Sequence, residues 1–94
     1  ETPKFIVLTR AAAPQSSIDT VTQLAPIFAA SGALTLRFGT LVTGSNAGNR
    51  LLGVTYPSMD AIEKTYDTLR ADANYQAALS DFNINLRAIV RVLM

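Results

Sequence analysis

Hydrophobic residues recur along this chain in two rhythms, one typical of β-strands and the other of α-helices. Lys4–Arg10 is short and apolar at successive positions, which predicts a strand covered on both faces. Leu34–Thr43 and Arg50–Tyr56 predict two further strands, and Ile84–Leu93 predicts a fourth. The fourth alternates, with one side formed by Ile84, Leu86, Ala88, Val90 and Val92 and the other by Asn85, Arg87, Ile89 and Arg91.

The segment after the first strand has the spacing of an amphipathic helix. Ser16 is a candidate N-cap, and Asp19 three residues later completes a weak capping box. Pro26 predicts a kink or a loosened turn, and Gly32 is suited to the left-handed conformation that ends many helices. The expected buried stripe consists of Ile18, Val21, Ala25 and Phe28.

A second helical segment begins after the third strand, which Pro57 ends. Ser58 is its candidate N-cap, and its buried stripe is expected to contain Met59, Ile62, Tyr66 and Leu69. Asp72 is placed to cap a further turn or two carrying Tyr75, Ala78, Leu79 and Phe82. Between the second and third strands, the turn formers of Gly44–Asn49 predict a hairpin with a long loop.

The order strand, helix, strand, strand, helix, strand predicts an α+β fold in one domain spanning residues 1–94. It is the ferredoxin-like βαββαβ arrangement, a four-stranded antiparallel sheet with its helices on one face. The other face is predicted to be partly apolar, with Leu41, Leu51 and Ile89 among Arg37, Gly39, Gly53, Arg87 and Arg91.

Two helices cannot cover this second face, and exposed apolar patches of several hundred Å² are uncommon on monomers. We therefore expect a homodimer that stacks the two sheets into a dimeric α+β barrel. The alternative is a monomeric ferredoxin-like interaction module with a partly apolar open sheet.

The stretch Thr55–Leu79, with its Asp72–Gln76 turn, resembles the second half of dimeric α+β barrel proteins. The loop Thr43–Gly48 is similar to the hairpin loop of uncharacterised bacterial members of that superfamily. The resemblance implies the dimeric barrel fold. The superfamily includes proteins similar to antibiotic-biosynthesis monooxygenases, haem-degrading enzymes, lactone isomerases and effector-binding domains of regulators, so the fold alone does not define a reaction.

Composition narrows the classes of partner. The 94 residues have a net charge of +1, which is too balanced for a nonspecific nucleic-acid-binding protein. Cysteine is absent, so disulfides and thiolate chemistry are excluded, and no apolar run approaches the roughly 20 residues of a membrane span. A cytoplasmic location is the default expectation, although a leader removed before Glu1 stays possible.

The absence of histidine and tryptophan restricts the chemistry further. The resemblance implies that haem-binding members use an axial histidine and cyclase-like members a histidine acid or base, which this chain does not have. Zinc and non-haem iron sites usually need imidazole or thiolate ligands, so we predict no metal and no cofactor. Asp60, Glu63 and Asp67 share one helix face, which we interpret as a solvated surface.

Five residues are candidate ligand-binding groups: Arg37, Tyr56, Tyr66, Asn85 and Arg87. Arg37 and Arg87 lie in strand centres, where an unpaired guanidinium is costly, so each meets either an anionic or carbonyl-bearing ligand or a structural partner. The resemblance implies that tyrosine, asparagine and arginine side chains orient a phenolic substrate in oxygenase-like members. Tyrosines in a helix stripe are also common core residues.

Two functions follow from these residues, and the sequence does not decide whether the protein is an enzyme. The first is a cofactor-independent, monooxygenase-like enzyme acting on a small aromatic or polyketide-like compound. It requires a cavity between helices and sheet lined by Tyr66 and one arginine. The second is a non-catalytic dimer that binds a small ligand or has a stress or accessory role.

Overall fold

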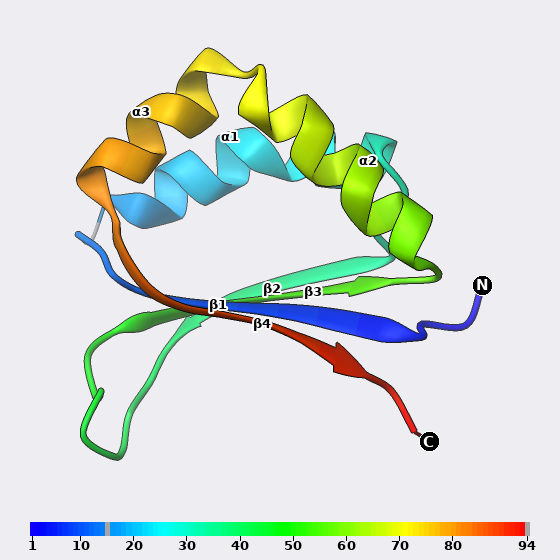
Figure 1. The fold of residues 1–94 in the computed structure, drawn as a ribbon. Coiled ribbons are helices and arrows are strands. Elements are labelled where there is room, and N and C mark those ends of the chain that lie inside the picture. Colours follow the sequence, from blue (N-terminus) through cyan, green and yellow to red (C-terminus); the bar gives the residue numbers. More distant parts are fainter. Residues whose placement is uncertain (15, 94) are drawn as a thin grey trace.

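A computed structural model describes residues 1–14 and 16–93 of the chain. Its elements, in chain order, are β1 (Phe5–Ala12), α1 (Ser17–Ala30), β2 (Thr35–Thr40), β3 (Arg50–Tyr56), α2 (Met59–Arg70), α3 (Ala73–Asp81) and β4 (Asn83–Arg91). The four strands form an antiparallel sheet in the order β2-β3-β1-β4, and all three helices lie on one face of it (Figure 1). The predicted ferredoxin-like α+β fold is thereby confirmed.

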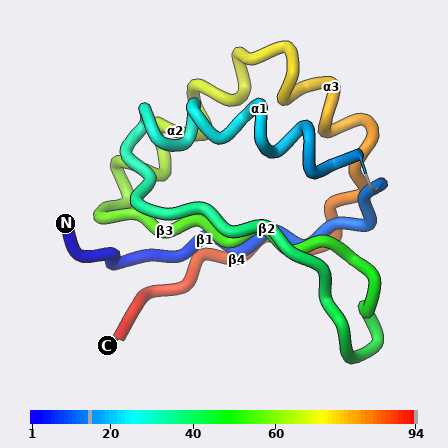
Figure 2. Tube along the Cα trace, turned by 180° about the vertical axis from the view of Figure 1, so that it is seen from behind, coloured from blue at the N-terminus to red at the C-terminus, as the bar shows by residue number. Residues whose placement is uncertain are grey.

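The chain termini and the β2–β3 loop lie at opposite ends of the sheet. The two termini lie at the same end of the molecule, and the loop between β2 and β3 bends away from the helices at the opposite end (Figures 1 and 2). Gly44 and Gly48 have positive φ values of 90° and 94°, which the turn formers of this loop supply. The second strand ends at Thr40, earlier than the predicted Thr43, because the chain turns away after Leu41.

The end of α1 follows the prediction, and its beginning does not. Gly32 has φ +109° and donates its N–H to the Ala29 carbonyl, while the Ala33 N–H reaches the Phe28 carbonyl. These two bonds form a Schellman motif with glycine in the left-handed position. At the other end the Ser16 side chain makes no capping hydrogen bond, so the proposed capping box is absent.

The buried stripe of α1 also differs from the prediction. Ser17, Val21, Leu24 and Phe28 are its buried residues, whereas Ile18 is 48% exposed. The spacing of the apolar residues admits either stripe, and the direction in which the helix crosses the sheet decides between them. The helix is continuous across Pro26, which lies on its exposed side.

The second helical region contains two helices with the expected caps. The Ser58 hydroxyl accepts the Ala61 N–H at 3.2 Å, and the Asp72 carboxylate accepts the Tyr75 N–H at 3.0 Å. Ile62, Thr65 and Leu69 are the buried residues of α2, while Met59 is 41% exposed. The core contains Phe5, Val7, Leu24, Phe28, Val54, Tyr56, Ile62, Leu69 and Tyr75.

Strand β4 carries a β-bulge that changes which side chains face the helices. Ala11 pairs with Ile84 and Arg10 pairs with Leu86, so Asn85 is an extra residue in the ladder. Opposite residues of paired strands share a face, and β1 buries Phe5, Val7 and Thr9 under the helices. The β4 residues on this helix side are therefore Ile84, Arg87, Ile89 and Arg91.

This register corrects the predicted open face. Arg87, Ile89 and Arg91 lie on the helix side, where the Arg91 guanidinium stacks over the Phe5 ring at 5.0 Å. Ile84 joins them because the bulge breaks the strict alternation of β4. The open face instead consists of Ile6, Leu8, Arg10, Thr35, Arg37, Gly39, Leu51, Gly53, Thr55, Leu86, Ala88 and Val90.

The open face is more apolar than the sequence analysis suggested, since Leu86, Ala88 and Val90 belong to it. Leu86 and Val90 are each 40% exposed, and no helix of the described chain covers this side (Figure 1). No strand residue is acidic, whereas the strands carry Arg10, Arg37, Arg50, Arg87 and Arg91.

Candidate functional site

A cavity of about 60 Å³ lies between the sheet and the helices. Its apolar wall comes from α1, α3, the sheet and two connecting residues: Ala11, Ala13, Val21, Leu24, Phe28, Phe38, Leu52, Ala78, Leu79, Phe82 and Ile84. Its polar lining residues are Thr9, Arg50, Tyr66, Tyr75 and Arg87. The cavity is therefore an apolar space with a few polar groups at its margins.

Arg87 is the centre of the polar groups. Its Nε donates to the Thr9 hydroxyl at 3.1 Å, and one terminal nitrogen lies 3.5 Å from the Tyr75 hydroxyl. The guanidinium carbon stands 4.9 Å from the centre of the Tyr66 ring, which is a cation–π distance. Strands β1 and β4 and helices α2 and α3 thus each supply one group of this cluster.

Sheet register explains why Arg87 reaches the cavity. Thr9 and Arg87 are paired residues on neighbouring strands, and β4 is an edge strand, so the arginine keeps contact with solvent. Within the described residues no carboxylate pairs with its guanidinium, and its partners are two hydroxyls and an aromatic ring. Its positive charge is therefore available to an anion or a carbonyl oxygen.

The buried tyrosines stay protonated at neutral pH. Burial raises the pKa of the Tyr66 phenol, and the neighbouring Arg87 charge and Thr9 hydroxyl offset only part of this effect. Burial also raises the pKa of the Tyr56 phenol, strongly, with a further contribution from Tyr66. Neither phenol is suited to act as a general base near neutrality.

Tyr56 lies beside this site without lining the cavity. Its side chain is 0% exposed, and its hydroxyl has no hydrogen-bond partner among the described residues. The nearby Thr65 hydroxyl lowers the Tyr56 pKa against the larger effect of burial, and it donates to the Ala61 carbonyl at 2.8 Å. Tyr56 is thus a core residue with an unsatisfied polar atom.

The structure brings two of the five candidates together in the cavity, Tyr66 and Arg87. Arg37 lies on the open face, where its guanidinium contacts the Leu36 carbonyl at 3.2 Å. Asn85 is the bulged residue and accepts a hydrogen bond from Arg10 Nε at 2.7 Å, so it does not meet Tyr66.

Sequence reasoning did not select Thr9 and Arg50 as site residues, and it did not place Tyr75 beside Arg87. Thr9 has the same parity as Phe5 and Val7, so its face was predictable, but a single threonine in a strand gives no functional signal. Arg50 begins β3 and its guanidinium donates to the Thr40 hydroxyl on β2. Tyr75 was noted as a tyrosine, and only the docking of α3 places it beside Arg87.

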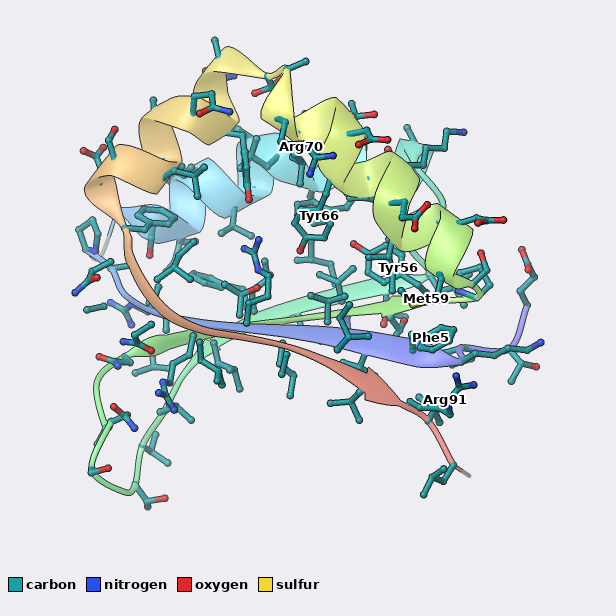
Figure 3. All side chains as sticks on the ribbon, viewed as in Figure 1. Phe5, Tyr56, Met59, Tyr66, Arg70 and Arg91 are labelled. Carbon is teal, nitrogen blue, oxygen red and sulfur yellow. The ribbon has the colours of Figure 1, made fainter. Side chains whose placement is uncertain are left out.

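A second, open groove of about 360 Å³ lies between α2 and the edge of β4. Met59, Ile62 and Ile89 supply its apolar walls, and Glu63, Asp67 and Arg70 its charged rim. Arg70 and Asp67 form an ion pair on the exposed side of α2. Tyr66 lines both this groove and the interior cavity, and Figure 3 shows its side chain extending from α2 towards the sheet.

The open face of the sheet is also hollowed. A depression of about 260 Å³ is lined by Arg37, Phe38, Gly39, Thr40, Leu41, Leu51 and Gly53. A side chain at Gly39 would meet no atom within 4 Å, and one at Gly53 would reach Leu8 at 3.7 Å. The two glycines therefore leave open space on the face that the helices do not cover.

Two further properties concern metals and membranes. Within residues 1–14 and 16–93, no three side chains among His, Cys, Asp and Glu gather in a way that could hold a metal ion. In the same residues, no helix combines the length and the apolar character that crossing a membrane requires.

The sheet order and the helix layer define a ferredoxin-like α+β protein with an apolar cavity under its helices. The chain belongs to the family described as a domain of unknown function, DUF6854, whose model matches residues 3–92. A search of curated protein sequences finds no match.

Solved structures confirm the fold. A dimeric ferredoxin-like protein from an uncultured marine organism is similar with a TM-score of 0.73 and 17% identity, over 99% of this chain and 98% of that chain. A second such protein from an uncultured marine organism has a TM-score of 0.70 and 10% identity, over 97% and 95% of the two chains. A NIPSNAP family protein from Agrobacterium tumefaciens has a TM-score of 0.59 and 16% identity, over 95% and 91%.

Proposed function

We propose that this protein binds a small, mostly apolar molecule carrying an anionic or carbonyl oxygen in the cavity under its helices. The observation that carries this function is the position of Arg87 at the margin of an otherwise apolar space. Arg87 is exposed and has no carboxylate partner among the described residues, so its guanidinium can form charge-assisted hydrogen bonds with a ligand oxygen at the mouth of the cavity. Binding sites for small molecules usually combine apolar walls with a few such polar groups.

The working form of the protein is a homodimer joined through the open face. Leu8, Leu51, Leu86 and Val90 form an apolar surface there that no helix covers. Two of the similar solved structures are described as dimeric ferredoxin-like proteins, which supports the same assembly here. Stacking the two sheets around a two-fold axis would produce the α+β barrel expected from the sequence. The cytoplasmic location stays a prediction from the sequence.

A monooxygenase-like activity is the second candidate, and the shared position of Tyr66 and Arg87 in the cavity favours it. Arg87 would stabilise the anion of a phenolic substrate, while the substrate itself reduces O₂. One oxygen atom would enter the product and the other would leave as water. No carboxylate lines the cavity, so the substrate would have to lose its proton to solvent. Oxygen uptake with a panel of phenols, compared between the wild type and Arg87→Met, tests this activity.

Binding is tested with butyrate, which joins a carboxylate to a short apolar chain, and with its neutral counterpart butan-1-ol. Amide shifts in a ¹⁵N-labelled sample should change around Thr9 and Arg87 on adding butyrate, and much less on adding butan-1-ol. The Arg87→Met variant should lose the butyrate response. Lys64→Met, which removes an exposed cation of α2 outside the cavity lining, is the matched control and should respond like the wild type.

The chemical shifts also show whether Arg87→Met keeps the fold. A folded Arg87→Met variant that still responds to butyrate like the wild type would contradict the assignment of Arg87. A wild-type protein that shows no response at millimolar butyrate would contradict the proposed cavity function itself.

A further inference from the structure

The groove beside α2 shares Tyr66 with the cavity as a lining residue, and we infer that the ligand spans both spaces with its oxygen in the middle. This inference rests on the proposed cavity function and adds the shape of the molecule. The ligand class is an elongated compound whose carboxylate or carbonyl group has an apolar arm on each side. One arm would occupy the interior cavity, and the other would lie between α2 and β4.

Volume is the first reason. The interior cavity measures about 60 Å³, which suits the three-carbon chain of butyrate with its carboxylate at the margin beside Arg87, whereas an apolar cavity known to hold benzene measures about 150 Å³. Sites for small organic ligands generally have volumes of about 300–1,000 Å³. The groove measures about 360 Å³ and lies in that range, but Arg87 does not line it, so a ligand of this size that binds Arg87 must extend from the cavity into the groove.

The order of residues along β4 is the second reason. Ile84 lines the cavity, Ile89 lines the groove, and Arg87 lies between them on the same face of the strand. An oxygen bound by Arg87 is therefore placed near the middle of the combined site. A compound with its oxygen at one end would fill only one of the two spaces.

Tyr66 separates the two spaces and is the third reason. Its ring lines both of them and stacks against the Arg87 guanidinium at 4.9 Å. A rotation of this side chain would join cavity and groove without moving the backbone. A ligand oxygen on Arg87 would take the place of part of this stacking interaction.

The groove walls fit an apolar arm. Met59 and Ile89 face it from the helix and the strand, and they are 41% and 51% exposed. Covering two such side chains removes apolar surface from water, which favours binding. Glu63 and Asp67 at the rim disfavour a second anionic group at the outer end of the arm.

The test compares butyrate with 2-benzylbutyrate, which carries an additional benzyl arm on the carbon next to the carboxylate. We expect 2-benzylbutyrate to bind at least about tenfold more tightly than butyrate, because the benzyl ring fills the groove. Ile89→Trp fills the groove with an indole and should cancel this gain, so that this variant binds the two acids with equal affinity. Met59→Trp narrows the groove from the opposite side and should have the same effect, which guards against failure of one variant to fold.

Ile18→Trp is the matched control, because Ile18 is an isoleucine of similar exposure, 48%, that lines neither space. It should keep the tenfold gain. Equal affinity for the two acids in the wild type, or a gain that survives in folded Ile89→Trp and Met59→Trp, would overturn the extended site.

The remaining outcomes separate this inference from the function on which it rests. Arg87-dependent butyrate binding without any gain from the benzyl arm would leave the cavity function standing and reject the extension. Absence of butyrate binding would reject both. A change in the solution mass of Ile89→Trp would show that the groove belongs to an interface between copies, and would also overturn the extension.

Discussion

Removal of one hydroxyl group from the core should stabilise this protein. Tyr56 is 0% exposed and its hydroxyl has no hydrogen-bond partner among the described residues. A buried polar group without a partner costs about 1–3 kcal/mol. Tyr56→Phe keeps the ring in the core and removes this cost, so the free energy of unfolding at pH 7 should rise by about 1 kcal/mol.

The same substitution should change the response to alkaline pH. The Tyr56 pKa is raised in the folded state above its ordinary value of about 10, so the folded protein favours the protonated phenol. The stability that this shift provides is complete below pH 10. It is lost above pH 10, where tyrosine ionises in the unfolded chain but not in the folded one. Each such group contributes up to about 1.4 kcal/mol per pH unit in this range.

Urea denaturation followed by circular dichroism, at one fixed protein concentration and at pH 7, 10 and 11, measures both effects. Tyr56→Phe should be more stable than the wild type at pH 7 and should lose less stability above pH 10. Tyr75→Phe is the matched control, since its hydroxyl lies 3.5 Å from an Arg87 nitrogen, and it should gain nothing at pH 7. A loss of 1 kcal/mol or more in Tyr56→Phe would refute the reasoning, because the hydroxyl would then have a partner, such as Thr65 or a water molecule.

Three further predictions concern the helix cap and the open face. Gly32→Ala should lower the free energy of unfolding by about 1–3 kcal/mol, because φ at this position is +109° and the new methyl group would stand 3.1 Å from the Ala61 Cβ. Urea denaturation measures this loss, and an unchanged midpoint would contradict the assigned cap. Leu8→Lys should shift the mass in light scattering from about 20 kDa to the 10.1 kDa of one chain, since it adds a positive charge to the proposed dimer interface, which already carries Arg10 and Arg37. A persistent dimer would place the interface elsewhere. Arg37→Met should strengthen dimerisation in sedimentation experiments by removing the cost of burying a guanidinium, and weaker association would show that Arg37 has a partner across the interface.

Helix caps and turn residues, which act within a few positions, predicted much of the fold. Ser58, Gly32 and Asp72 each mark a helix end by side-chain or backbone chemistry that acts within a few residues, and each was predicted correctly. The hairpin loop was recognised for the same reason. The order of elements then admits few arrangements, because connections are short and sheets need cover on at least one face.

The candidate site was less predictable because it depends on register. The alternation of β4 predicts one side for Ile84 and Leu86, and the bulge at Asn85 places them on opposite faces. A bulge of this kind is set by pairing with β1 and leaves no signal in the strand itself. The sequence therefore named Arg87 and Tyr66 as candidates but did not show that they share a cavity, or that Arg37 lies on the other face.

The separation of charge between the two layers has a consequence for assembly. Every acidic side chain lies outside the strands, so the sheet is an electropositive layer beneath helices that carry Asp19, Asp60, Glu63 and Asp67. Two copies that meet sheet to sheet would bring like charges together. Mobile ions screen such repulsion over about 10 Å at 0.1 M salt. The dimer of this protein should therefore become more stable as ionic strength rises, whereas an interface held by ion pairs would become weaker. The ionic strength would thus set the fraction of chains present as dimer.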